Sequence, residues 1–116
     1  TLTYEKVCVF IVVSIAFESS VDKAFMIMQE EAVNHPLCID NRSVEEIQDN
    51  KAVVATRVIG FSDLGVQLRA DAWARDAAEG FELKCAVYKS YKERFDKEGI
   101  ALAHRTAIAK NIEPLV

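Results

Sequence analysis

The sequence predicts an α+β domain whose elements follow the order β-α-β-β-α-β, the ferredoxin-like arrangement. Three observations predict this order. Residues 53–73 have the pattern of a two-stranded hairpin, and residues 21–34 and 78–98 each carry apolar side chains at helical spacing. We therefore expect residues 1–116 to form a single domain, with a four-stranded antiparallel sheet and two helices on one of its faces.

The first strand is expected from about Lys6 to Ala16, because this stretch is rich in β-branched residues. It is apolar at both odd and even positions, which is typical of a strand buried on both faces. A central strand that tolerates some exposed valine is one interpretation. The other is that the sheet face without helices packs against another domain or subunit.

The first helix is expected to begin after Ser20, whose hydroxyl suits an N-cap, and to end near Asn34, two residues before Pro36. Its expected buried residues share helical spacing: Val21, Ala24, Phe25, Met28 and Ala32. One further helical turn is predicted at Ser43–Glu46.

The hairpin is expected to pair residues 53–59 with residues 66–73 through the turn Ser62–Gly65. The apolar residues of its second strand alternate with polar ones: Val66, Leu68, Ala70 and Ala72. The only tryptophan, Trp73, falls on the polar side. Either the strand has ended there, or the polar side is covered by something.

The second helix is expected from about Ala78 to Glu98, with Gly99 as its left-handed C-cap. One side of it is predicted to pack on the sheet through Phe81, Cys85, Tyr88, Tyr91 and Phe95. A closing strand, in one or two pieces, is predicted from the apolar residues Ile100, Leu102 and Ile108.

Composition excludes several classes of function. The net charge of −4 argues against a nucleic-acid surface, and the longest apolar run is about half the ~20 residues that span a bilayer. The three cysteines have no zinc or disulfide spacing. His35 and Cys38 lie close together in the sequence and could form a nucleophilic pair, but no third, orienting group is in view and a structural role is favoured. We expect no enzymatic activity, no cofactor and no metal.

Six segments together resemble the carboxy-terminal cytoplasmic domain of small-conductance mechanosensitive (MscS-like) channels. They are Val13–Ala24, His35–Leu37, the hairpin segments Arg57–Asp63, Leu68–Ala70 and Trp73–Ala74, and the helix with its stop, Lys89–Ile100. The family usually has a Pro-aromatic-Pro stretch before a His/Gln-Arg-Thr triplet. Here Ala101–Ala103 leads directly into His104–Thr106.

The resemblance implies that this chain is a fragment of a longer membrane protein, with transmembrane segments and a β domain upstream. That protein would lie in the cell (inner) membrane, with this domain in the cytoplasm. It would assemble as a homo-heptamer that releases ions and small solutes on hypo-osmotic shock. Residues 105–112 would be the terminal strand through which copies associate.

From the pattern and the resemblance together, we expect self-association and an oligomer interface. Its predicted residues are Val7, Val9, Ile11, Trp73, Arg105, Thr106 and Ile108. The alternative is a ferredoxin-like regulatory module that binds a small ligand or another protein.

Overall fold

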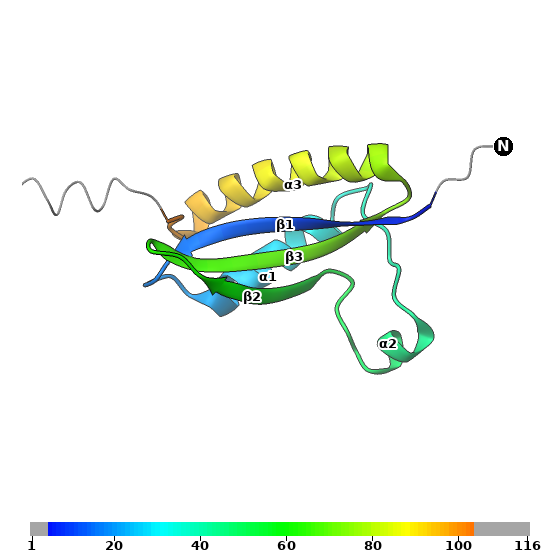
Figure 1. Ribbon diagram of the computed structural model, residues 1–116, viewed down its shortest axis with the longest axis horizontal. Coiled ribbons are helices and arrows are strands. Elements are labelled where there is room, and N and C mark those ends of the chain that lie inside the picture. Colours follow the sequence, from blue (N-terminus) through cyan, green and yellow to red (C-terminus); the bar gives the residue numbers. More distant parts are fainter. Residues whose placement is uncertain (1–4, 104–116) are drawn as a thin grey trace, which may run out of the picture.

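The computed structural model describes residues 5–103. The elements in chain order are β1 (Val7–Ala16), α1 (Val21–Val33), α2 (Val44–Gln48), β2 (Ala55–Phe61), β3 (Gly65–Ala74) and α3 (Ala77–Glu98). Figure 1 shows α1 and α3 on the same side of the sheet, while α2 lies apart from it on a long connection. The helices therefore cover one face of the sheet and leave the other open.

The sheet has three antiparallel strands in the order β1-β3-β2, so the hairpin's second strand is central. β1 pairs with β3 without interruption, from Val7 opposite Ala74 to Ala16 opposite Gly65. The pairing of β2 with β3 shifts register between Val58 and Gly60, as at a β-bulge. The hairpin predicted from the period of two is confirmed, with strand ends displaced by one or two residues.

The core lies between the sheet and the two long helices. The central strand contributes every second residue, and Leu68, Ala70 and Ala72 are fully buried. β1 contributes Ile11 and Ile15, and α3 contributes Tyr91 and Phe95 among others. The Tyr91 hydroxyl donates a 2.8 Å hydrogen bond to the Met28 carbonyl and so links α3 to α1.

The predicted four-stranded, ferredoxin-like sheet is wrong: within residues 5–103 the sheet has three strands, and a third helix, α2, stands between α1 and β2. Where the closing strand was expected, Leu102 forms a single bridge with Ile15. The Tyr88 hydroxyl accepts a hydrogen bond from the Val12 amide and donates one to the Val12 carbonyl. These are the edge groups that the next pair of a fourth strand would use; within residues 5–103 the last backbone hydrogen bond to this edge joins Ala103 and Ser14. The later residues of the predicted strand, Ile108 included, lie outside the described residues.

The predicted helix ends are confirmed, and their caps explain them. The Ser20 hydroxyl accepts from the Lys23 amide at the start of α1, and Asp76 accepts from the Glu79 amide at the start of α3. Gly99 ends α3 with φ of 77°, the left-handed conformation that favours glycine.

The predicted inner side of α3 is only half right. Tyr91 and Phe95 are buried, but Phe81 is 71% exposed and Cys85 and Tyr88 are also at the surface. Gly80, Leu83 and Val87 are buried instead. A Cβ on Gly80 would lie 2.9 Å from Val7 Cγ2, so α3 approaches β1 more closely than any larger residue allows.

The buried side of α1 is close to the prediction. Ala24, Met28 and Ala32 are buried as expected, together with Ile27, which the prediction omitted. Val21 and Phe25 are partly buried and pack against the same core.

Candidate functional site

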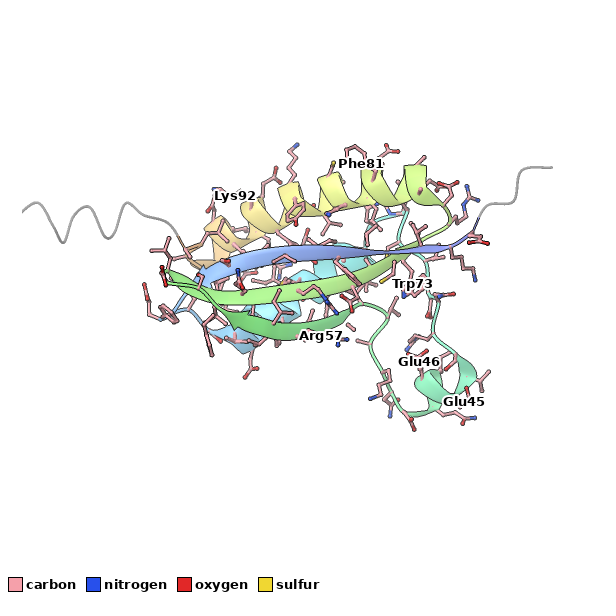
Figure 2. The ribbon with its side chains drawn as sticks, viewed as in Figure 1. Glu45, Glu46, Arg57, Trp73, Phe81 and Lys92 are labelled. Atoms are coloured by element: carbon pink, nitrogen blue, oxygen red, sulfur yellow. The ribbon has the colours of Figure 1, made fainter. Side chains whose placement is uncertain are left out.

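The open face of the sheet is the candidate functional surface, because alternate residues of the strands point away from the helices. In β1 and β3 these residues face one another across the register, with Cys8 opposite Trp73, Phe10 opposite Asp71 and Val12 opposite Arg69. We define the open face by its side chains: Cys8, Phe10, Val12, Arg57, Arg69, Asp71 and Trp73. Figure 2 shows Arg57 on β2 and Trp73 near the far end of β3.

Two large apolar side chains are exposed on the open face. Phe10 is 49% exposed and Val12 is 38% exposed. The Arg69 guanidinium carbon lies 4.2 Å from the centre of the Phe10 ring, the geometry of a cation–π contact. This contact holds the Phe10 ring in place while the rest of it stays available to a partner.

A group of three charges crosses the same face. Asp71, whose side chain is 14% exposed, pairs with Arg69 Nε at 2.8 Å and with Arg57 Nη2 at 3.4 Å. Two guanidinium groups against one carboxylate leave this face with one net positive charge. The Arg57 side chain remains 55% exposed and so is free to contact a further acidic group.

Trp73 belongs to the strand, which answers the question raised by its position in the sequence. β3 continues to Ala74, and the Trp73 carbonyl accepts a 2.9 Å hydrogen bond from the Ile39 amide on the side where β2 has ended. The indole is half-buried and borders a cavity of about 300 Å³ that Cys8, Arg42 and Asp71 also line. Burial, with a smaller contribution from Asp71, raises the pKa of the Cys8 thiol.

The predicted interface residues are divided between the two faces. Trp73 lies on the open face, whereas Ile11 is fully buried in the core. Val7 and Val9 face α3, since a Cβ on Gly80 would meet both. Arg105, Thr106 and Ile108 lie outside the described residues.

Phe10 and Val12 were missed as candidates, although the strand's alternation places them together. β1 is apolar at both parities, so its sequence alone does not say which side meets the helices. The signal was in the hairpin: β3 buries its even-numbered residues, and antiparallel pairing with β3 assigns the odd-numbered residues of β1 to the same side.

His35 and Cys38 are held by local backbone contacts. His35 Nδ1 accepts a 3.1 Å hydrogen bond from the Leu37 amide, and the Cys38 amide bonds to the His35 carbonyl. Burial raises the pKa of the Cys38 thiol, the opposite of what a thiolate nucleophile requires. These contacts favour the structural interpretation of this pair.

Residues 5–103 contain no group of three or more side chains placed to hold a metal ion. No helix in the same range has the length and apolar character needed to cross a membrane. No protein-family model matches the sequence, and no curated protein matches it significantly.

Proposed function

We propose that this chain is part of the cytoplasmic cage of a homo-oligomeric, MscS-like mechanosensitive channel in the cell membrane. The complete protein would open under bilayer tension and release ions and small solutes on hypo-osmotic shock. In this proposal the domain has no catalytic step, cofactor or metal, and its role is to associate with copies of itself. The observation that carries the proposal is the open face, where Phe10, Val12 and Trp73 lie together on a sheet covered by helices on one side only.

The resembling segments support the proposal through their positions in the fold. One contains the β1-to-α1 connection with its cap at Ser20, and another contains the end of α3 with Gly99. The three hairpin segments lie on the paired strands β2 and β3 and on the turn between them. The resemblance therefore includes the connections and helix ends where the chain changes direction, as well as apolar stretches that many folds share.

Physical reasoning connects the open face with assembly. Exposed apolar area of this kind is stabilised when it is covered, and in a ring of identical subunits a neighbouring copy supplies the cover. Phe10 is 49% exposed, and burying the roughly 100 Å² that this represents would contribute about 2.5 kcal/mol per copy at ~25 cal/mol per Å². Many copies each adding such a term favour a closed assembly.

A second candidate function is supported by the cavity beside Trp73. Its walls carry an aromatic ring, the Asp71 carboxylate and the guanidinium of Arg42, which is a set that suits a small planar ligand with a charged group. A regulatory module that binds such a ligand would need the open face to remain uncovered. The two functions therefore make opposite predictions about Trp73 in the assembled protein.

The test uses the full-length protein in membrane patches under suction. We expect currents that appear with tension and are absent from patches without the protein. In parallel, Phe10→Asp should impair assembly of the full-length protein, whereas Asp63→Lys, at the exposed hairpin turn, should leave it intact. Absence of tension-activated current from correctly inserted protein would reject the proposal.

A further inference from the structure

The cavity beside Trp73 lies where the connection between α1 and β2 meets one end of the open face. The sheet contributes Arg57, Asp71 and Trp73 to its lining, and the connection contributes Asn41 and Glu46 among others. A backbone hydrogen bond to the Trp73 carbonyl ties the connection to β3. The volume of about 300 Å³ is at the lower end of the range for small-molecule sites.

The two carboxylates that line the cavity already have partners. Asp71 accepts a 2.8 Å hydrogen bond from Arg69 Nε and also pairs with Arg57. Glu46 accepts a 2.9 Å hydrogen bond from the Ser43 amide as part of the capping box of α2. A cationic ligand would therefore have to compete with contacts inside the chain for either carboxylate.

The two arginines of the cavity differ in how far their N–H groups are used. Arg42 directs Nε and Nη2 to the Asp40 carboxylate and Nη1 to the Lys51 carbonyl, so its guanidinium is held in place. Arg57 makes one ion pair within residues 5–103, at 3.4 Å from Asp71, and its side chain is 55% exposed. Most of its planar fork is therefore available, and such a fork binds a carboxylate through two parallel hydrogen bonds.

The remaining polar groups also favour an anion. Asn41 Oδ1 accepts a 3.2 Å hydrogen bond from Lys6 Nζ, and its NH₂ group has no acceptor within residues 5–103. The two arginines and two acids that line the cavity cancel in charge. The charged side chains bonded to the lining residues are two cations and one acid: Arg69, Lys6 and Asp40. The site thus has unused donors and one net positive charge, which suits a ligand with acceptor oxygens.

Trp73 gives the same cavity an aromatic surface. Its indole is half-buried, and Cys8, which lies opposite it in the register, also lines the cavity. A planar ring can pack against the indole in an offset or edge-on arrangement. Asp71, the partner of Arg57, is two residues from Trp73 along β3, a span of ~7 Å. A bicyclic aromatic acid has about this length.

We propose that this cavity binds a small aromatic carboxylic acid, with its ring against the Trp73 indole and its carboxylate on the Arg57 guanidinium. This inference rests on the second candidate function and names its ligand class. Figure 2 shows Arg57 and Trp73 on the sheet and Glu46 on α2. The ligand would lie where the residues of these elements line the cavity.

The test is a titration of the dilute whole chain with 2-naphthoate, followed by NMR through the indole N–H resonance of Trp73, the only tryptophan. We expect a saturable shift with a dissociation constant of about 1 mM or lower. The probe 2-naphthylmethylammonium has the same ring and a positive group, and it should bind at least about tenfold more weakly. Equal affinity for the two probes, or no saturable shift with 2-naphthoate up to ~10 mM, would overturn the proposal.

A pair of variants tests the assignment to Arg57. Arg57→Met keeps most of the side-chain length and removes the guanidinium, so it should weaken 2-naphthoate binding at least about tenfold. The matched control is Lys89→Met, which removes an 81% exposed cation of α3 outside the cavity and should leave binding unchanged. Equal weakening in the two variants, both folded by circular dichroism, would overturn the assignment.

The outcomes separate this inference from both candidate functions. Tighter binding of 2-naphthylmethylammonium than of 2-naphthoate rejects the ligand class and retains a ligand-binding module. Binding of 2-naphthoate without tension-activated current from the full-length protein retains the site and rejects the channel. Tension-activated current without 2-naphthoate binding rejects the site alone.

Discussion

Replacing Tyr91 with phenylalanine isolates the one hydrogen bond that joins the two long helices through the core. Tyr91 is 1% exposed, and its hydroxyl lies 2.8 Å from the Met28 carbonyl. Because Met28 is inside α1, its carbonyl also accepts from the amide four residues later, so the variant does not leave it unpaired. We therefore expect a loss of about 1 kcal/mol, the net value of one buried hydrogen bond. This corresponds to a melting temperature lower by about 4 °C.

The matched control is Tyr88→Phe on the same helix. The Tyr88 hydroxyl also reaches backbone groups, at Val12, but Tyr88 is 36% exposed and water can replace the bond. Urea unfolding should give Tyr88→Phe less than half the loss of Tyr91→Phe. Equal losses in the two variants, or no loss in Tyr91→Phe, would refute the reasoning about burial.

The stability difference between the natural chain and Tyr91→Phe should also depend on pH, with a sign that follows from the pKa of Tyr91. Burial raises the pKa of Tyr91 above its ordinary value of 10.0. A raised pKa in the folded state gives a contribution that is complete below about pH 10 and is lost as the pH rises above it. The stability advantage of the natural chain over Tyr91→Phe should therefore shrink in alkaline urea titrations. An advantage that is constant from pH 8 to about pH 11 would contradict this.

Three further predictions concern the packing of Gly80 against β1, the ion pair between Arg94 and Glu98, and the cap of α2. Gly80→Ala should destabilise the chain by about 1 kcal/mol despite the better helix propensity of alanine, because its Cβ would lie 2.9 Å from Val7 Cγ2. In a Val7→Ala background this loss of stability should be smaller. An unchanged loss would contradict the packing argument. Arg94 holds the pKa of Glu98 below its ordinary 4.5, a contribution present above about pH 4.5 and lost as the pH falls below it. The difference in urea midpoint between the natural chain and Arg94→Met should thus be larger at pH 7 than at pH 3, and equal differences would refute the role of the pairing. Ser43→Ala should speed amide exchange within α2 without changing the melting temperature, because α2 buries none of its residues. A lower melting temperature would show that α2 contributes to the stability of the core.

Local signals in the sequence predicted most of the fold because the features that determine it are themselves local. The period of two in β3, the hydroxyl at Ser20 and the glycine at Gly99 each act within a few residues, and the structure has the predicted element at each place. The predicted turn at Ser43 is also present, as the capping box of α2.

The errors come from contacts between residues distant in sequence. The fourth strand was predicted from apolar alternation alone, and the sequence does not reveal that the Tyr88 hydroxyl bonds to the edge of β1 at Val12. The inner side of α3 was assigned by the size of its aromatic residues. The close approach of β1 instead selects Gly80 and turns Phe81 outward.

The predicted interface residues and the open face coincide only at Trp73. Trp73 could be identified from the sequence because it is an aromatic residue at a position where the alternation of the strand predicts a polar one. Phe10 and Val12 required the register between β1 and β3, which is a property of the folded sheet. The sequence around Val44 and Ile47 does not distinguish an exposed helix such as α2 from a packed one.

The central claim is that copies of this chain cover one another's open face, and Trp73 reports on it directly because it is the only tryptophan in the sequence. Its fluorescence emission should be recorded together with the sedimentation coefficient as the chain is concentrated. Covering the exposed part of the half-buried indole should shift its emission to shorter wavelength as larger species form, and Phe10→Asp should abolish both changes. A monomer's sedimentation coefficient with unchanged Trp73 emission at every concentration would contradict the claim.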